Sequence, residues 1–158
     1  MIRLRAPRPG DLGRVVQLHG AIYAREFGYD VTFEALVARI VADFVRALDP
    51  RRERCWIAQA DGEVVGSVFV VRASRASAKI RLLIVAPRAR GFGLGRRLVR
   101  ACIRFARRAG YRRLVLWTQS LLEAARAIYQ SEGFRRVARE RHASFGKRLV
   151  GEFWELKL

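Results

Sequence analysis

Residues 88–98 read RARGFGLGRRL, with three glycines at alternate positions, arginine on both sides and a helical pattern directly after them. A Walker A phosphate loop is excluded, because it needs GxxxxGK followed by Ser or Thr. A GxGxxG dinucleotide fingerprint is incomplete, since Arg96 stands where its third glycine belongs. The pattern that remains, Arg90-x-x-Gly93-x-Gly95, favours a pyrophosphate bound by free amides at a helix N-terminus. A glycine-rich turn that only starts a helix is the alternative.

Length and composition predict one globular domain over residues 1–158, because the chain is 51% hydrophobic. No run approaches 18 uninterrupted apolar residues, and the N-terminal MIRLRAPRPG lacks the apolar region of a secretory signal. We therefore expect neither a membrane segment nor a signal peptide. Cys55 and Cys102 fall in apolar patterns and are expected to be buried thiols, as in a reducing cytoplasm. No metal site is expected.

The net charge of +18 comes from 29 Arg and 3 Lys against 14 acidic residues. It indicates either a polyanionic partner, such as nucleic acid, an anionic membrane surface or a phosphorylated ligand, or the codon usage of a GC-rich genome. Fourteen Arg and Lys but no Asp or Glu lie between Val64 and Leu122, a window that contains the glycine stretch. A ligand bound near that stretch is therefore expected to be anionic.

Hydrophobic periodicity and turn residues predict the element order β-α-α-β-β-β-α-β-α-β-β. Strands are expected over 2–6, 55–60, 63–71, 79–85, 113–118, 134–142 and 150–158, and helices over 11–27, 32–48, 93–109 and 121–132. Asp11 and Thr32 are the expected N-caps of the first two helices. The third helix carries six arginines within an arc of about 120°. The order predicts an α/β fold with a mixed, mostly antiparallel sheet flanked by helices.

Two segments, LLIVAPRARGFGLGRRL at 82–98 and ARAIYQSEGF at 125–134, resemble the GNAT superfamily of acyl-CoA-dependent N-acyltransferases. The family's [Q/R]-x-x-G-x-[G/A] loop is matched by Arg90, Gly93 and Gly95, and its late tyrosine by Tyr129. The element order is similar over the whole chain. Segments such as LHGAIY and FEALVARIVADF further resemble the acetyltransferase half of bacterial fusions with a MarR-type winged-helix regulator. The chain leaves no room for the DNA-binding half, so no regulatory role is expected.

The resemblance implies that acetyl-CoA, as cosubstrate, lies in a cleft between the fourth and fifth strands. It implies that the backbone of three strand residues binds the pantetheine arm and that the amides of the loop bind the pyrophosphate. The strand residues are Leu83, Ile84 and Val85, and the loop residues are Arg90, Gly91, Phe92, Gly93, Leu94, Gly95 and Arg96. It also implies direct attack by a neutral amine on the thioester, with Tyr129 as the acid that protonates the leaving thiolate.

The sequence departs from the family at the general base. Trp117 stands where some relatives carry Glu, and Leu122 replaces the Asn that often precedes the tyrosine. The candidates that remain are ordered water and three side chains: His142, Glu26 and His19. The last two share one face of the first helix with Tyr23, a face that either recognises the amine or is simply solvated.

The predicted activity is N-acetyltransfer to a small-molecule or peptide amine. A basic module that binds nucleic acid through the arginine face is one alternative, although the chain has no recognised nucleic-acid motif. A catalytically silent acyl-CoA sensor is another, because the family's Glu is missing. No membrane partner is expected, and the family resemblance allows a homodimer.

Overall fold

The computed structural model describes all residues 1–158 and contains one seven-stranded sheet in the order β1-β2-β3-β4-β5-β7-β6. The strands are β1 (Ile2–Arg5), β2 (Arg54–Ala60), β3 (Glu63–Arg72), β4 (Ser77–Val85), β5 (Arg113–Gln119), β6 (Arg135–Ser144) and β7 (Lys147–Lys157). The helices are α1 (Asp11–Phe27), α2 (Val31–Arg46), α3 (Leu94–Arg108) and α4 (Glu123–Ser131). Only β4 and β5 pair in parallel, so the predicted mixed, mostly antiparallel sheet is confirmed.

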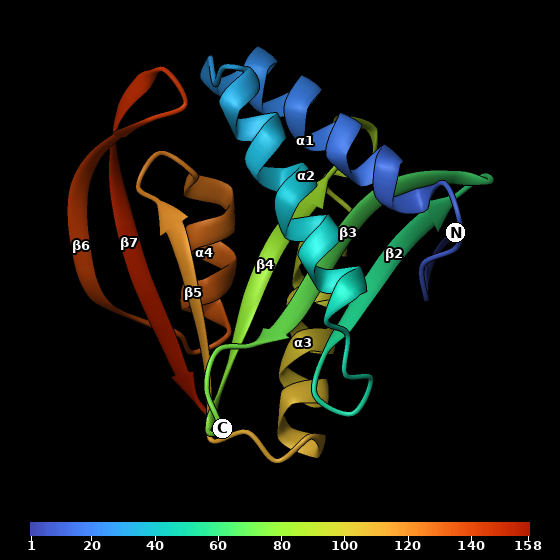
Figure 1. Cartoon of the computed structure of the whole chain (residues 1–158), viewed down its shortest axis with the longest axis vertical. Coiled ribbons are helices and arrows are strands. Elements are labelled where there is room, and N and C mark those ends of the chain that lie inside the picture. Colours follow the sequence, from blue (N-terminus) through green and yellow to red (C-terminus); the bar gives the residue numbers. More distant parts are fainter.

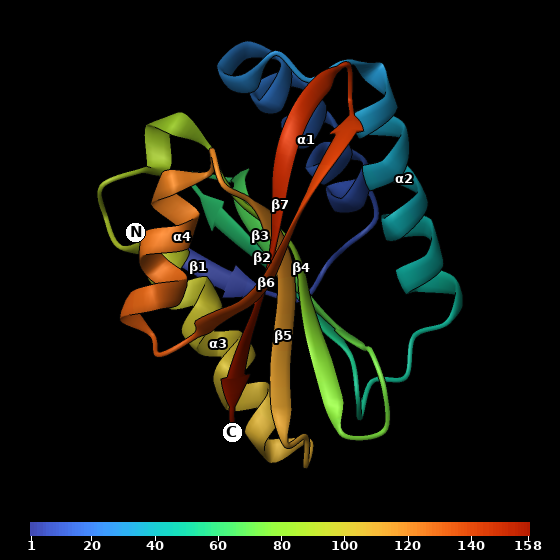
Figure 2. The same ribbon diagram turned by 90° about the vertical axis from the view of Figure 1, so that its left-hand side faces the viewer.

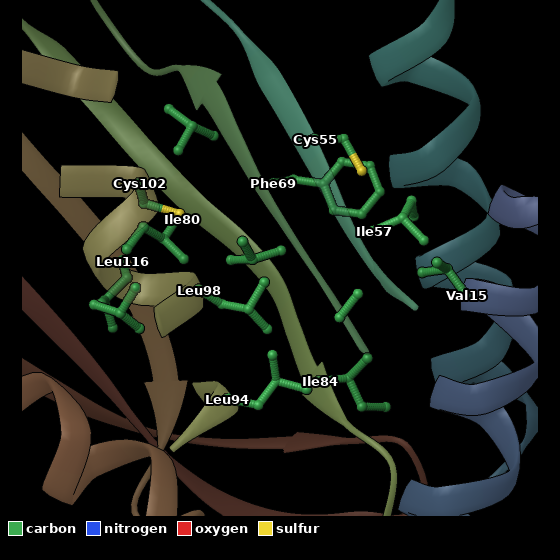
Figure 3. Packing of buried hydrophobic residues seen from close by; sticks show 14 of the residues in the cluster. Val15, Cys55, Ile57, Phe69, Ile80, Ile84, Leu94, Leu98, Cys102 and Leu116 are labelled. Atoms are coloured by element: carbon green, nitrogen blue, oxygen red, sulfur yellow. The ribbon is translucent and has the colours of Figure 1, made fainter. Parts of the chain in front are cut away.

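Helices cover both faces of the sheet, with α1 and α2 on one face and α3 and α4 on the other (Figure 1 and Figure 2). On the α3 side, Leu98 and Cys102 pack towards Ile80, whereas Cys55 and Phe69 point towards α1 and α2 (Figure 3). Both cysteines are buried and free, as expected, and the sheet separates them. None of the four helices is long and apolar enough to cross a membrane.

A β-bulge bends β4 at Leu82. The pairs Ser67↔Ile84 and Phe69↔Arg81 enclose one residue on β3 but two on β4, so β4 carries one extra residue. Leu82 takes the left-handed backbone conformation, with φ 54°, that lets the strand absorb this residue. The Ser67 hydroxyl donates a hydrogen bond to the Leu82 carbonyl at 3.4 Å, which links β3 to the bulge.

Beyond the first half of β4, the strands β4 and β5 separate. Their parallel pairing runs from Ser77↔Arg113 to Ile80↔Leu116 and ends there. β4 continues to Val85, whereas β5 stays paired with β7 along its whole length. The two strands therefore diverge like the arms of a V (Figure 1). The edge of β4 that faces β5 has no strand partner after Ile80.

Both expected N-caps are displaced. α2 begins at Val31 and is capped by Asp30, whose carboxylate accepts a hydrogen bond from the Thr32 amide at 3.0 Å. Thr32 is therefore inside the helix rather than its cap. α1 has Gly10 as its N-cap because the Asp11 carboxylate is engaged by Arg5 and by the Arg8 amide.

The last two strands are longer than predicted and form a tight hairpin. Phe145 and Gly146 join them with φ angles of 58° and 79°, as in a type I′ turn. Sequence analysis missed this turn because a bulky residue rarely adopts positive φ. Here the Phe145 ring packs against Tyr29 and Phe33, with ring centroids 5.0 Å away in both cases. The hairpin tip is thereby fixed to the loop between α1 and α2.

The close approach of β3 to the bulged strand requires glycine at position 66. A Cβ on Gly66 would lie 2.7 Å from the Ile84 carbonyl oxygen, whereas one on Gly13, within α1, meets nothing within 4 Å. We expect Gly66→Ala to lower the free energy of unfolding by about 1–3 kcal/mol. Gly13→Ala, the matched control, should raise it by about 0.5–1 kcal/mol. Urea unfolding measures both, and a Gly66→Ala variant as stable as the parent would contradict the proposed constraint.

Candidate functional site

Two hollows lie where β4 and β5 separate. The larger cleft has a volume of about 640 Å³ and is bounded by α1, the second half of β4, the start of α3 and the α4 region. The smaller cavity has a volume of about 130 Å³ and lies between the first half of β4, the end of β5, α1 and α2. Tyr23, Leu83, Leu122 and Ala125 line both. The two hollows therefore adjoin, and a group held in one can meet a group held in the other.

The glycine stretch forms one end of the larger cleft. Gly91 and Gly93 have φ angles of 86° and 76°, and a Cβ on either would meet no protein atom within 4 Å. Gly93 is also the N-cap of α3, where no side chain caps the helix and no acidic residue lies in the first turn. The first amides of α3 are thus available to a ligand, and the helix dipole favours an anion.

Nine of the ten residues predicted to bind the cofactor line the larger cleft: Leu83, Ile84, Val85, Arg90, Gly91, Gly93, Leu94, Gly95 and Arg96. Phe92 does not line it, and its side chain is 74% exposed. Gly95 lies under α4, because a Cβ there would be 2.8 Å from the Ile128 Cδ1. The glycine stretch therefore combines an open anion site with close helix packing.

Glu26, one of the candidate bases, lies in the larger cleft and is paired with Arg90. The guanidinium donates to both carboxylate oxygens at 2.9 Å, and its Nε donates to the Val85 carbonyl at 3.3 Å. Glu26 does not line the smaller cavity. The structure thus brings Glu26 to the cofactor side of the site and separates it from the position expected of a base for the amine.

The smaller cavity has an aromatic wall. Tyr23, Tyr29, Phe33, Trp117 and Phe145 line it, and the ring centroids of Tyr23 and Phe33 are 4.5 Å apart. This wall assembles from α1, the α1–α2 connection, α2, β5 and the β6–β7 turn, elements far apart in the sequence. The cavity therefore forms only when these elements pack together, and no single sequence motif predicts it.

His19, the second candidate base, is buried beside this wall. Its Nδ1 donates to the Val15 carbonyl at 2.8 Å, because a carbonyl can only accept, and its Nε2 therefore carries the free lone pair. That Nε2 has no partner in the protein. Burial lowers the pKa of His19 to about 4, so the ring is neutral and weakly basic at physiological pH.

His142, the third candidate base, lines neither hollow. Its Nε2 lies 2.8 Å from the Gln119 Oε1 and its Nδ1 lies 2.9 Å from the Ser144 hydroxyl. Both ring nitrogens are therefore occupied. The ring lies 5.3 Å from the Trp117 ring, centroid to centroid, so His142 supports the wall of the smaller cavity from outside.

Tyr129 lines the smaller cavity from α4 and is 5% exposed. Its ring packs against Phe134 at a centroid distance of 5.7 Å, and α4 is attached to β7 by the Arg126–Glu152 ion pair at 2.8 Å. Burial, with Tyr23 and Cys102 nearby, raises the pKa of Tyr129 above its ordinary value. The hydroxyl therefore keeps its proton at neutral pH and is available as a donor.

Sequence reasoning did not identify Lys79 and Arg81 as site residues. Both lie on β4 and line the smaller cavity, which contains no Asp or Glu. Their spacing of two residues on a strand was the available signal, because it places both side chains on one face of the sheet.

The arginine face of α3 lies away from both hollows, apart from Arg96. Arg100 pairs with Glu132 at 2.7 Å, and Arg97 donates to the Ile2 carbonyl at 3.1 Å. Part of this basic face is therefore used within the protein.

Comparison with known proteins agrees with this geometry. The sequence model of the Acetyltransferase (GNAT) family matches residues 20–134. N-acetyltransferase family 8 member 2 of Rattus norvegicus is 31% identical over 116 residues, which are 70% of this chain and 51% of that protein. N-acetyltransferase family 8 member 3 of the same species is 34% identical, over 61% of this chain and 45% of its own. The chain thus spans about half the length of these relatives.

Solved structures share the fold along the whole chain. The ribosomal-protein-alanine N-acetyltransferase from Brucella melitensis superposes with a TM-score of 0.79, at 22% identity and with 99% of each chain covered. A Salmonella typhimurium protein solved with its cofactor acetyl-CoA superposes with a TM-score of 0.77 at 21% identity, covering 99% of this chain and 94% of its own. Together with the residues matched by the family model, this shows that the chain belongs to the GNAT family of acetyltransferases.

Proposed function

We propose that this protein transfers the acetyl group of acetyl-CoA to an amine. The observation that carries the proposal is the junction of the two hollows, because a thioester held in the larger cleft would meet an amine held in the smaller cavity at Tyr23, Leu83, Leu122 and Ala125. The acetyl-CoA found with the Salmonella neighbour, which shares this fold, supports acetyl-CoA as the cosubstrate.

The larger cleft suits coenzyme A chemically. The uncapped α3 amides and the open glycines at 91 and 93 fit a diphosphate, and Arg96 adds a positive charge. The unpaired edge of β4 at Leu83, Ile84 and Val85 fits the amide groups of a pantetheine arm. Bound acetyl-CoA supplies an activated acyl group. Arg90 reaches a ligand phosphate only by loosening its pair with Glu26.

The reaction moves two protons, and one of the protein's own residues handles one of them. Tyr129, whose hydroxyl stays protonated, donates towards the leaving sulfur. The amine proton passes to water, because Glu26 and Glu123 line only the larger cleft, His142 lies outside the smaller cavity, and His19 is too weakly basic at a pKa of about 4. The acceptor must therefore reach the cavity as the neutral amine.

Several narrower expectations belong to the same proposal. We propose that residues 1–158 act as one domain in a bacterial cytoplasm, as the two reduced, buried cysteines favour. The narrower likeness to the acetyltransferase half of MarR-type fusions rests on the sequence segments alone. A homodimer would be compatible with the family. Family membership makes a nucleic-acid module and a silent sensor less favoured alternatives.

The first test is calorimetric titration of acetyl-CoA at moderate salt. We expect one-to-one binding that Gly93→Asp abolishes, because the new carboxylate would stand at the diphosphate position. Gly62→Asp is the matched control, since Gly62 has a φ of 77° with open space around it and lies in the β2–β3 turn. It should bind as the parent does. Equal binding by Gly93→Asp would contradict the proposed site.

Replacing the tyrosine hydroxyl tests the acid. Tyr129→Phe keeps the ring packing on Phe134 and removes the proton donor, so kcat should fall by about 10²–10⁴-fold with acetyl-CoA affinity unchanged. Steady-state kinetics and calorimetry separate the two effects. Unchanged turnover in Tyr129→Phe would remove this residue from the mechanism.

The pH profile tests the proton route. Only the neutral amine reacts, so kcat/KM should rise about tenfold per pH unit below the pKa of the acceptor. No step is expected near pH 6, because the pKa of His19 is about 4 and His142 lies outside both hollows. His142→Ala should keep the same profile. A step near pH 6 that disappears in His142→Ala would identify histidine as the base.

A further inference from the structure

Lys79 and Arg81 place two unpaired positive charges on the wall of the smaller cavity. Both side chains are half-buried, and neither forms an ion pair with any carboxylate of the protein. Burial lowers the pKa of each, and the neighbouring Arg81 lowers that of Lys79 further. Asp43 is the one acidic group that acts on Arg81, and it does not line the cavity. An anion that binds beside half-buried cations without a partner stabilises their charge.

Three buried polar atoms around the same cavity also lack partners. They are the Nε2 of His19, the hydroxyl of Tyr29 and the Nε1 of Trp117, and they are the only such side-chain atoms in the chain. All three residues line the smaller cavity. Buried polar groups are normally satisfied, so their concentration here indicates a polar ligand.

The chemistry of these atoms restricts that ligand. The Tyr29 hydroxyl can donate and the His19 Nε2 can only accept, since Nδ1 already donates to Val15, whereas the Trp117 Nε1 lies over Gly151 of β7. A matching ligand therefore offers anionic oxygen acceptors together with at least one N–H donor. A carboxylate and a primary amine on one small molecule meet both requirements.

We propose that the acceptor is a free amino acid with an apolar or aromatic side chain, whose carboxylate is bound by Lys79 and Arg81. The inference rests on the proposed acetyltransferase function. The aromatic wall of Tyr23, Phe33 and Phe145 suits an apolar side chain, and the cavity of about 130 Å³ adjoins the larger cleft, into which the amine end of the molecule extends. A polyamine or a lysine side chain would bring positive charge to a cavity that already holds two cations.

The two cations also act on the reacting amine. Like charges nearby disfavour its protonated form, so they favour the neutral amine that attacks. The amine nitrogen then forms a bond to the acetyl carbonyl carbon while the carbon–sulfur bond breaks. The amine proton passes to water and the sulfur takes a proton from Tyr129, which leaves an N-acetylated amino acid and a free thiol. The hydroxyl of Tyr129 is restored from solvent.

The test compares acceptors that differ only in the carboxylate. Acetyl transfer to L-phenylalanine is measured beside 2-phenylethylamine and L-phenylalaninamide, with L-leucine and spermidine completing the panel. We expect kcat/KM for L-phenylalanine to exceed that for both neutral-ended analogues by tenfold or more, because a charge-assisted hydrogen bond is lost without the carboxylate.

Variants assign the effect to the two cations. Lys79→Met and Arg81→Met should each lower kcat/KM for L-phenylalanine at least tenfold and lower that for 2-phenylethylamine by much less, because 2-phenylethylamine loses only the effect of the cations on its amine. Lys157→Met is the matched control, since Lys157 is exposed at the far end of β7 and should change neither. Thermal stabilisation of the protein by N-acetyl-L-phenylalanine, lost in Lys79→Met, gives a readout that does not depend on turnover.

The outcomes separate this inference from the proposed function. Failure of acetyl-CoA to bind defeats the proposed function and the inference together. Binding of acetyl-CoA with preference for 2-phenylethylamine or spermidine, or without turnover of either amino acid, overturns the inference and leaves the cofactor site standing. Equal losses for both acceptors in Lys79→Met would also overturn it, because that pattern indicates general damage to the cavity.

Discussion

Four residue pairs hold β4 parallel to β5, and the end of that pairing after Ile80↔Leu116 determines where the protein can bind anything. The extra residue at Leu82 turns β4 away, while β7 keeps β5 in place. A sheet that stayed paired would fill this space with its own hydrogen bonds. Because it separates, two adjoining hollows open inside an otherwise close-packed molecule.

The electrostatics of these hollows follow from the missing carboxylates between residues 64 and 122. That window supplies at least half of the lining of each hollow, so the larger cleft receives arginines and free amides and the smaller cavity receives Lys79 and Arg81. Glu26 enters from α1, outside the window, and is held by Arg90. A site built this way favours anions in both halves, and its smaller cavity offers no carboxylate to remove a proton from the acceptor.

Local signals predicted much of the fold. Periodicity located every α-helix and strand, and the glycine stretch identified the connection between β4 and α3. The glycine stretch could be predicted to lie at a helix N-terminus because the start of a helix is a local structure. The caps shifted because the Asp11 carboxylate is held by Arg5 and the Arg8 amide, and because the Asp30 carboxylate accepts from the Thr32 amide. The Phe145 turn was missed because tertiary packing on Tyr29 stabilises a backbone that the residue itself disfavours. His142 and Lys79 likewise depend on how distant strands meet, which no single segment encodes.

The unpaired edge of β4 also affects how the protein tolerates change. Along residues 83–85, the edge of β4 that faces the larger cleft has no strand partner, and every residue except proline offers the same N–H and C=O there. Contacts made through them persist when side chains are exchanged. Selection on such contacts acts on backbone shape, through Leu82 and Gly66, rather than on side-chain identity. The neighbouring side chains can therefore change extensively while the edge still binds. An alanine scan of this strand would not detect these contacts, because alanine keeps the backbone N–H and C=O groups.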